Sequence, residues 1–389
     1  MHLCVVSFKE CWQNGDGTWL STGGFPLQMD AIGSLFDDLT LVIVGGERGH
    51  GGMALPSRGR VVPLRRPSGT GTARKLDVIR HLGYYTRTIA ACVRQADAVH
   101  VPLPGDMPFL GMVVALALRK RVLARYCGAW EKTPQTSLMN QVTKRWMRHF
   151  AAGPHVMLAT GEGIAPPAPA MRWIFATALS RAELERPAPA LDRGLGHPPR
   201  LISVGRLSRE KGVAVLLNAV AQLRREGYTP LPPVTIVGDG PERRTLEAQV
   251  ADLGCRGVIT FTGQLTRGEL AAQFALADVC VQPSLTEGFS KAWLDAMAYG
   301  LPVLSSAVGA APAVIGRAGE RGWLVPPGDA PGLAGAIRRV LAGPIDWPAL
   351  RRRCRSYVEG RTLEAWAHEI GRACAQRWGL RLEGGKLRA

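Results

Sequence analysis

The sequence predicts an α/β protein with two doubly wound, Rossmann-like domains that face a central cleft. Its 389 residues are too many for one ordinary core and suit two domains. In both halves short apolar runs alternate with helical stretches, a pattern typical of parallel strands joined by crossover helices. A stretch rich in proline separates the halves. In such folds ligands bind outside the carboxyl ends of the strands.

Residues 1–180 are predicted to form the first domain. Short apolar runs predict strands at 3–8, 39–44, 98–102, 122–126, 156–160 and 171–175. Helices are expected at 25–36, in the apolar stretch that ends in the three cations at 119–121, and at 137–150, where the pattern is amphipathic and basic. Repeated prolines, among them Pro187 and Pro189, make 181–199 an interdomain linker.

Residues 200–345 are predicted to form the second domain, with a more regular pattern. Strands are expected at 200–204, 234–237, 258–262, 279–283, 303–305 and 322–325. Helices are expected between them at 212–226, 241–253, 267–276, 290–298 and 330–341. Residues 347–378 indicate two further helices that are rich in arginine.

The overall charge restricts the partners. The formal net charge of +17 favours nucleic acid, anionic lipid or substrates that carry phosphate, although a compositional bias toward arginine would give the same number. The eight cysteines are scattered without a CxxC pair, which supports neither a zinc site nor a disulfide framework. The first residues are typical of a strand and not of a signal peptide. We therefore expect a cytoplasmic protein, either free or attached to the inner face of the cell membrane.

Two cations flank the loop after the first strand of the second domain. The strand ends at Gly205, and Arg206 and Lys211 precede the next helix. A helix N-terminus attracts anions, and arginine and lysine add a fork and a point charge for phosphate. The segment is therefore a candidate diphosphate clamp. The alternative is an ordinary loop with solvated charges. Further on, the glycines at Gly238 and Gly240 predict a tight turn beside the ligand.

Two acids follow the strand predicted at 279–283. Glu287 lies in the loop beside Gly288, and Asp295 stands eight residues further on, inside the next helix. An acid that faces apolar neighbours is costly unless it has a partner, and a ribose diol would be one. Glu287 could accept hydrogen bonds from sugar hydroxyls in the same way. The alternative for Asp295 is a solvated helix face.

In their order and spacing these segments resemble the family 4 retaining glycosyltransferases of GT-B fold. The resemblance rests on residues 205–212, 237–241 and 287–303, and it covers 200–345 closely and the N-terminal half more loosely. It implies transfer of a sugar from a nucleotide-diphosphate sugar to a glycan or a lipid-diphosphate-linked acceptor, in cell-surface or exopolysaccharide biosynthesis. It also implies retention of anomeric configuration. Residues 346–389 would pack back toward the N-terminal domain.

The resemblance implies roles for individual residues. Glu287, Arg206 and Lys211 would be catalytic, with Glu287 at the donor sugar and the two cations at the diphosphate. The residues expected to bind the donor are Gly24, Gly205, Gly238, Gln264, Leu265, Phe289, Ser290, Lys291 and Asp295. Of these, Gln264 and Leu265 would lie at the base and Asp295 at the ribose. The donor would be a UDP- or GDP-sugar. No cofactor or metal is expected, and the chain has no Asp-x-Asp motif that would ligate one.

The sequence departs from the family pattern at two positions. The second acid is Asp295 where the family has Glu, so it is shorter by one methylene. In the N-terminal half Cys127 occupies the position at which many relatives carry a His near the anomeric carbon. Cys127 and His100 are candidates on the acceptor side, and a buried core histidine is the alternative for His100.

The N-terminal half also carries a run of cations near aromatic residues, which would suit an anionic membrane face. These cations are Arg119, Lys120, Arg121, Arg125, Lys144, Arg145 and Arg148, and Trp130 and Trp146 lie among them. Two other functions are compatible with the sequence: a sugar-nucleotide epimerase of the same fold, and a basic nucleic-acid-binding protein. The second is disfavoured because no known binding module is present.

Overall fold

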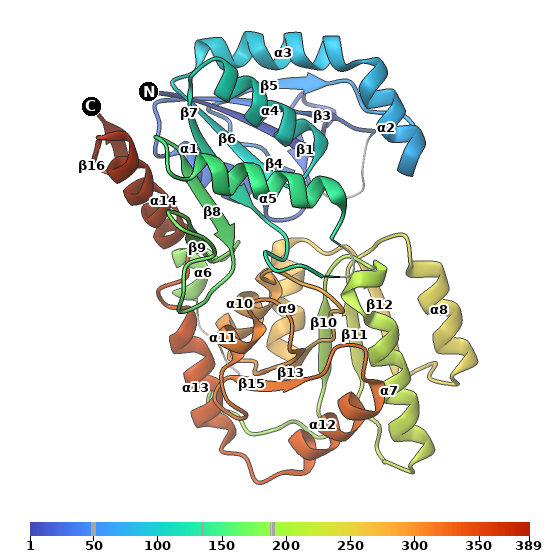
Figure 1. The fold of residues 1–389 in the computed structure, drawn as a ribbon. Coiled ribbons are helices and arrows are strands. Elements are labelled where there is room, and N and C mark those ends of the chain that lie inside the picture. Colours follow the sequence, from blue (N-terminus) through green and yellow to red (C-terminus); the bar gives the residue numbers. More distant parts are fainter. Residues whose placement is uncertain (48–51, 134–135, 187, 189–190) are drawn as a thin grey trace. The chain divides into compact units, whose positions relative to one another are not determined.

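The computed structural model describes residues 1–47, 52–133, 136–186, 188 and 191–389, and it separates them into two compact units (Figure 1). Met1–Ala178 and Leu363–Ala389 form the N-terminal unit, and Leu179–Thr362 form the C-terminal unit. The predicted linker therefore belongs to the C-terminal unit. Its Pro187 and Pro189 lie outside the described residues.

A parallel sheet in the order β12-β11-β10-β13-β14-β15 forms the centre of the C-terminal unit. Its strands are β10 (Leu201–Val204), β11 (Val234–Val237), β12 (Ile259–Gly263), β13 (Val279–Gln282), β14 (Val303–Ser306) and β15 (Gly322–Val325). Every residue of β13 and β14 is buried, as the near-continuous apolar pattern of a central parallel strand requires. If β10 is numbered as the first strand, the spatial order of the strands is 3-2-1-4-5-6. The direction in which successive strands are added to the sheet reverses between β10 and β13.

Helices connect these strands, as the alternation in the sequence predicts. They are η1 (Arg209–Lys211), α7 (Val213–Arg225), α8 (Arg243–Asp252), α9 (Arg267–Leu276), α10 (Lys291–Ala298), α11 (Ala311–Ile315) and α12 (Ala330–Ala342). The short helix α6 (Arg181–Leu184) precedes β10 and begins with a capping box between Ser180 and Glu183.

The two C-terminal helices belong to different units, in contrast to the prediction that both pack toward the N-terminal domain. Helix α13 (Trp347–Val358) lies in the C-terminal unit, where it packs against α10. Its Arg351 is fully buried and donates to Asp278 at 3.0 Å, next to the start of β13. A buried charge needs its partner, so this ion pair fixes α13 to the C-terminal sheet. Helix α14 (Leu363–Trp378) packs against α1 in the N-terminal unit.

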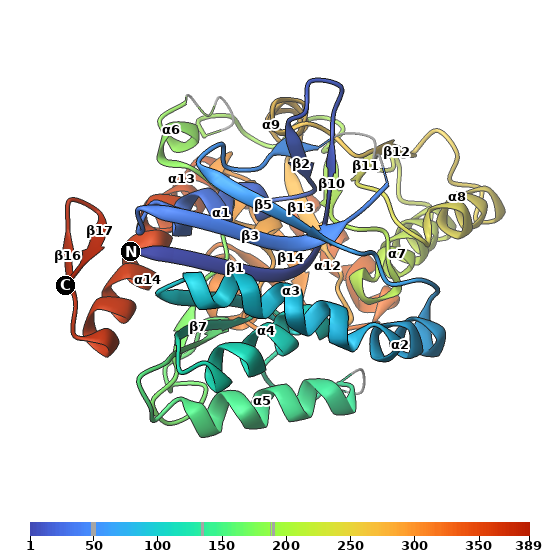
Figure 2. The ribbon, with the colours of Figure 1, turned by 90° about the horizontal axis from the view of Figure 1, so that it is seen from above.

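The N-terminal unit contains a second doubly wound sheet, in which parallel strands run β5-β3-β1-β6-β7-β8-β9. Their bounds are β1 (His2–Gln13), β3 (Asp38–Gly45), β5 (Gly59–Leu64), β6 (Ala98–Leu103), β7 (Arg121–Tyr126), β8 (Val156–Thr160) and β9 (Arg172–Ile174). Figure 2 shows β1, β3 and β5 side by side. The short strands β2 (Trp19–Ser21) and β4 (Met53–Ala54) extend the far end of β1 in antiparallel pairing. The predicted α/β class with two doubly wound sheets is confirmed.

Helices α1 (Phe25–Gly33), α4 (Asp106–Ala117) and α5 (Leu138–Phe150) correspond to the three predicted in this half. Three further elements, β5, α2 (Gly71–Arg80) and α3 (Leu82–Gln95), are not among those predicted from the sequence. A hairpin of β16 (Arg381–Glu383) and β17 (Lys386–Arg388) follows α14. No helix among the described residues is both long and apolar enough to cross a bilayer.

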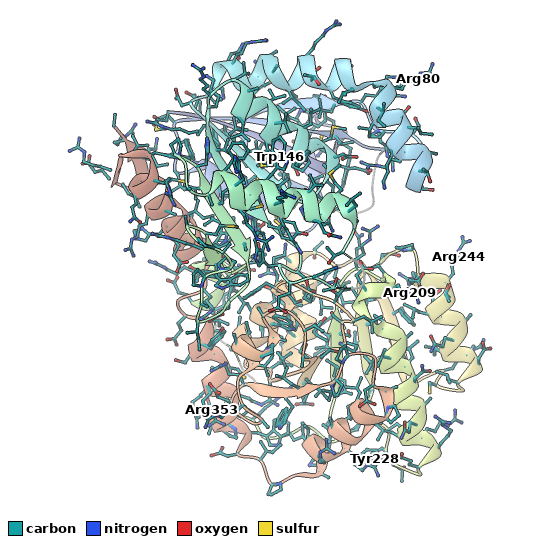
Figure 3. The ribbon with its side chains drawn as sticks, in the orientation of Figure 1. Arg80, Trp146, Arg209, Tyr228, Arg244 and Arg353 are labelled. Carbon is teal, nitrogen blue, oxygen red and sulfur yellow. The ribbon has the colours of Figure 1, made fainter. Side chains whose placement is uncertain are left out.

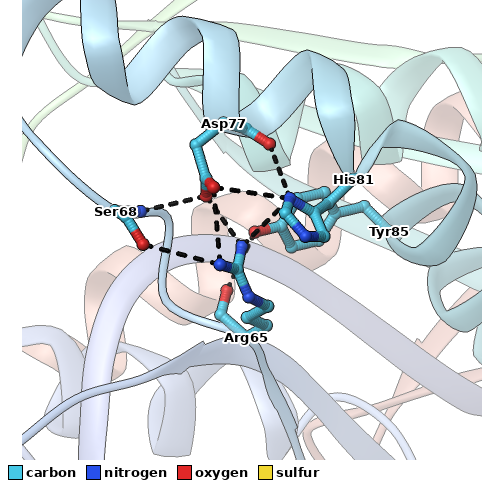
Figure 4. Close-up of polar contacts among 5 residues, drawn as sticks. All are labelled: Arg65, Ser68, Asp77, His81 and Tyr85. Carbon is cyan, nitrogen blue, oxygen red and sulfur yellow. Dashed lines mark hydrogen bonds and ion pairs between the residues drawn. The ribbon is translucent and has the colours of Figure 1, made fainter.

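Polar contacts hold α2, which has no buried residue, to the end of β5 (Figure 4). Arg65 follows β5 and donates to the Asp77 carboxylate at 2.7 Å, and the backbone N–H of Ser68 donates to the same oxygen at 3.0 Å. Arg65 lowers the pKa of Asp77, and the Ser68 amide adds to the effect. His81 lies beside both groups at the junction of α2 and α3.

Candidate functional site

The loops after β10 and β13 come together where the strand order of the C-terminal sheet reverses. Leu285 follows β13, and Glu210 lies in η1, which follows β10. The backbone N–H of Leu285 donates to the Glu210 carbonyl at 2.8 Å. Gly212 has a φ of 65°, and a Cβ there would overlap the carbonyl oxygen of Pro283. Only glycine fits this position, so the residue that ends the clamp segment lets the two loops approach.

This contact joins the first of the two acids to one of the two cations. The Lys211 ammonium donates to Glu287 Oε2 in a short ion pair, and Glu287 Oε1 accepts from the backbone N–H of Gly288 at 3.2 Å. The side chains are 25% and 13% exposed, so water can reach both but screens them less than at an open surface. Glu287, expected at the donor sugar, and Lys211, expected at the diphosphate, thus contact each other directly.

The loop after β14 supports Glu287 from the other side. The backbone N–H of Ala310 donates to the Gly288 carbonyl at 2.9 Å. Gly309 has a φ of 54°, and a Cβ there would overlap the Glu287 carbonyl oxygen. Gly309 is not among the predicted site residues, although a glycine shortly after a buried strand is a signal for such a close approach.

The second cation of the candidate clamp is arranged differently. Arg206 is exposed, and its guanidinium makes no hydrogen bond or ion pair with any residue that the structure describes. Its charge still contributes to the low pKa of Glu210, after the hydrogen bond from Ser208 and the Lys211 charge, all of which outweigh the effect of burial. Arg206 is therefore available to an anion, whereas Lys211 has a carboxylate partner.

The start of α10 carries the backbone N–H groups that the resemblance assigns to the donor sugar and phosphate. Ser290 is the N-cap residue, but its side chain does not cap the helix, so the first N–H groups lack that acceptor. Phe289 and Ser290 are buried, and the Phe289 ring packs on Trp293 at 5.7 Å between centroids. Lys291 is the first residue of the helix and is partly exposed. This N-terminus can accept an anion.

The two glycines at the ends of β10 and β11 pack against each other. Gly238 has a φ of 130°, and a Cβ there would overlap the carbonyl oxygen of Gly205. Its N–H donates to the Gly263 carbonyl at 2.9 Å. Gly205 and Gly238 therefore allow the chain to pack closely where β10, β11 and β12 end.

Asp295, the second acid, is buried and paired. Its Oδ1 accepts from Arg267 Nη2 at 2.8 Å, and it is 7% exposed. Arg267 also donates through Nε to Glu183 Oε1 at 2.6 Å. Burial would lower the pKa of the Arg267 guanidinium, but the Asp295 and Glu183 carboxylates outweigh it and raise that pKa. The alternative of a solvated helix face for Asp295 is therefore wrong.

Gln264 and Leu265 lie between β12 and α9, directly before this arginine. Gln264 is exposed and Leu265 is partly exposed. A capping box between Thr266 and Glu269 fixes the start of α9. Arg267 is not among the predicted site residues, although a cation within a capping box beside the predicted base loop is a signal in the sequence.

The three candidates in the N-terminal unit have different environments. Gly24 is the N-cap residue of α1, and no side chain caps that helix. Cys127 follows β7, is exposed, and carries a free thiol. His100 is fully buried in β6, and its Nδ1 lies 2.9 Å from the carbonyl oxygen of Leu123. Burial and the nearby Arg125 charge lower the pKa of His100 to about 3, so the ring is neutral. This environment matches the core-histidine alternative.

Two of the cations assigned to the basic surface are buried instead. Arg125 is 4% exposed, because its guanidinium stacks 4.9 Å above the Trp366 ring and donates to Gln28 Oε1 at 3.0 Å. Lys144 is also 4% exposed and lies over the Tyr126 and Trp130 rings. Sequence spacing places both residues among exposed cations, but aromatic neighbours cover them.

A cavity of about 390 Å³ lies within the N-terminal unit, between β8, the Ala170 turn before β9, and α14. Arg172 and Arg377 are among its lining residues. It contains none of the predicted donor or acceptor residues. Within the part of the chain that the structure describes, no three His, Cys, Asp or Glu side chains are grouped so that they could hold a metal ion.

Comparison with known proteins gives a consistent result. Residues 198–343 match the family model described as glycosyl transferases group 1. A GDP-mannose-dependent alpha-(1-6)-phosphatidylinositol monomannoside mannosyltransferase from Mycolicibacterium smegmatis is 34% identical over 182 residues, which are 44% of this chain and 45% of that protein. The chain spans less than half the length of the curated relatives first matched.

Solved structures match over nearly the whole chain. A sucrose-phosphate synthase from Thermosynechococcus elongatus has a TM-score of 0.74 at 21% identity, over 97% of this chain and 99% of that one. The Anabaena protein HepE, solved with UDP and glucose, has a TM-score of 0.70 at 17% identity, over 96% and 99%. These likenesses show the fold alone. The chain has the GT-B fold, and its residues 198–343 are similar to the family described as glycosyl transferases group 1.

Proposed function

We propose that this protein is a glycosyltransferase that moves a sugar from a nucleoside-diphosphate sugar to a glycan or lipid-linked acceptor, with retention of anomeric configuration and without a metal. The observation that carries the proposal is the Lys211–Glu287 pair at the point where the C-terminal sheet reverses its order. In open α/β sheets this is where ligands bind. The match of the same segment to the glycosyl transferases group 1 model supports it.

The charges at the site suit a leaving diphosphate. Arg206 is available, Lys211 is close by, and α10 begins beside them without a side-chain cap. Together they would stabilise the negative charge that develops on the departing diphosphate, which is the task a metal performs in other enzymes. Glu287 is positioned by Gly288 and Gly309 and would face the sugar. The acceptor hydroxyl would attack from the face that the diphosphate leaves, and its proton would pass to the departing phosphate oxygen.

The donor base is proposed to be uracil or guanine. The Mycolicibacterium relative is named for GDP-mannose, and HepE was solved with UDP. A thermal-shift series with UDP, GDP, UDP-glucose and GDP-mannose should raise the melting temperature with only one base. At about 100 times the dissociation constant the stabilisation is about 2.7 kcal/mol, a shift of several degrees.

Turnover distinguishes transfer from the other functions considered. We expect free nucleoside diphosphate to appear from the preferred donor only when a polyprenyl-diphosphate-linked sugar is added. An epimerase would convert the donor without an acceptor, and a nucleic-acid-binding protein would bind DNA in a salt-dependent manner without any nucleotide shift. Either of these results would reject the proposed transfer.

We also propose that the N-terminal unit attaches to an anionic membrane surface through α5. Leu138 and Met139, at the start of this helix, are 76% and 49% exposed. Arg145 and Arg148 are exposed on the same helix, and Trp146 lies between them in sequence. Trp146 is labelled on this helix in Figure 3. Exposed apolar residues combined with cations on one helix are typical of an interfacial helix.

Charge reversal on α5 tests this attachment. Arg145→Glu combined with Arg148→Glu should weaken sedimentation with vesicles of phosphatidylglycerol and phosphatidylcholine by at least about tenfold, because each lost cation contributes about 1 kcal/mol. Arg225→Glu, at the exposed C-terminal end of α7 in the C-terminal unit, is the control and should sediment like the unaltered protein. Equal binding of all three proteins, or no preference for anionic vesicles, would contradict the attachment.

A further inference from the structure

Arg267 connects the shortened second acid to a fixed point elsewhere in the C-terminal unit. Its guanidinium contacts two carboxylates, Glu183 of α6 and Asp295 of α10. The Arg267 side chain is 26% exposed and those of Glu183 and Asp295 are 11% and 10% exposed. Charged groups so little exposed hold their geometry better than a surface pair, because water competes less for them.

The Glu183 side of this connection is rigid. Glu183 Oε1 accepts from Arg267 Nε at 2.6 Å, and Oε2 accepts from Nη2 at 3.3 Å, so the contact is a two-point fork. Glu183 Oε2 also accepts from the backbone N–H of Ser180 at 2.9 Å and from its hydroxyl at 3.1 Å. The capping box therefore fixes Glu183, and Glu183 in turn fixes the plane of the guanidinium.

The Asp295 side leaves one oxygen unused. Asp295 Oδ1 accepts from Arg267 Nη2 at 2.8 Å, and Oδ2 has no hydrogen-bond donor among the residues that the structure describes. A carboxylate held through one oxygen can accept from a ligand hydroxyl through the other. Arg267 is also two residues from Leu265. The same residue therefore borders the loop predicted to contact the donor base and pairs with the acid predicted to contact the ribose.

We propose that Arg267, fixed by Glu183, is the positioning residue that aims the Asp295 carboxylate at the donor ribose hydroxyls. The proposal rests on the proposed function, since it assumes a nucleoside-diphosphate donor. The proposal accounts for the shorter side chain of Asp295, which has one methylene less than the Glu of the family pattern. Because Arg267, itself held by its forked contact with Glu183, fixes the Asp295 rotamer, the carboxylate is held in one orientation toward the hydroxyls. Arg267 acts through Asp295 and does not itself contact the ribose.

The test compares the affinity for a ribonucleotide with the affinity for the same nucleotide without its 2′ and 3′ hydroxyls. Calorimetric affinities of the full chain are measured for UDP, GDP and their 2′,3′-dideoxy counterparts. The unaltered protein should bind the preferred ribonucleotide about tenfold more tightly than its dideoxy form, and Arg267→Met should reduce that ratio to about one by weakening only the ribonucleotide. Arg267→Lys should give an intermediate ratio, because it retains the charge and loses the fork.

Arg244→Met is the matched control. Arg244 is exposed on α8 and extends away from the ribbon (Figure 3). The ratio should stay that of the unaltered protein. Glu183→Gln provides a second variant in case Arg267→Met folds poorly, because it keeps the arginine and the side-chain shape. It should lower the ratio about threefold or more, since the fork then loses its charged anchor.

The outcomes separate the two levels of the inference. If the unaltered protein binds neither UDP nor GDP, the proposed function fails and the positioning role fails with it. If it binds one of them but Arg267→Met weakens ribo- and dideoxy-nucleotides equally, Arg267 has a merely structural role and only the positioning role is overturned. The same holds if the unaltered protein does not distinguish the two sugars, or if Glu183→Gln and Arg267→Met both leave the ratio unchanged.

Discussion

Glu287→Gln is expected to reduce sugar transfer by about 10²–10³-fold, the cost typical of removing one group that stabilises charge in a transition state. Glutamine has the same shape and keeps an oxygen for the Gly288 amide, but it carries no negative charge toward the sugar. Affinity for the nucleoside diphosphate should change by less than about threefold, because the cations and amides assigned to the phosphates remain. Initial rates of acceptor glycosylation, together with calorimetry of the diphosphate, measure the two effects separately.

Glu247→Gln is the control for this experiment. Glu247 forms a surface pair with Arg243 on α8, and such exposed pairs contribute little to stability. Its rate and melting temperature should equal those of the unaltered protein. Near-normal turnover of Glu287→Gln would remove Glu287 from the reacting centre.

Lys211→Met is expected to weaken binding of the nucleoside diphosphate by about 10–100-fold, since a hydrogen bond to a charged group contributes about 1.5–3 kcal/mol. Binding of the nucleoside without phosphates should stay unchanged if Lys211 contacts only the diphosphate. The variant should also melt at a lower temperature, because Glu287 then lies partly buried without its cation. Calorimetry with both ligands and a thermal melt without ligand measure these effects.

The double variant Lys211→Met with Glu287→Gln separates folding from binding. Without the Glu287 charge, losing Lys211 leaves no unpaired acid, so the melting temperature should recover while the diphosphate affinity stays low. Arg206→Met supplies the comparison within the clamp. Its guanidinium has no ion-pair partner among the described residues, so it should lose affinity with no change in melting temperature. Diphosphate affinity that survives in Lys211→Met would reject the clamp.

Local pattern was sufficient for much of the C-terminal unit. The strand at Gly322–Val325 and the helix at Arg267–Leu276 have the predicted bounds. Both follow from signals within a few residues: an apolar run after a turn, and a capping box before a helical pattern. Where parallel strands are buried on both faces, the apolar run itself identifies them.

The same reasoning missed elements whose pattern is weak. β5 alternates only in part and contains Pro63 at a sheet edge, and α2 has no buried residue at all. A helix without an apolar face has no period for the sequence to display. It is held instead by the contacts of Arg65 with Asp77, which join residues twelve positions apart.

The sequence by itself determined the class of fold, the order of the loops around the candidate site and the residue types available there. Glu287, Lys211 and Asp295 could be named from spacing, because Glu287 and Lys211 stand in segments that directly follow predicted strands and Asp295 lies in the next helix. Only the tertiary structure decided their partners: Lys211 pairs with Glu287 across 76 residues, and Asp295 pairs with Arg267 across 28. It also decided that Arg125 and Lys144 are covered by aromatic rings. The physical reason is that spacing along a chain fixes which element carries a side chain, whereas burial and pairing depend on elements far away in sequence.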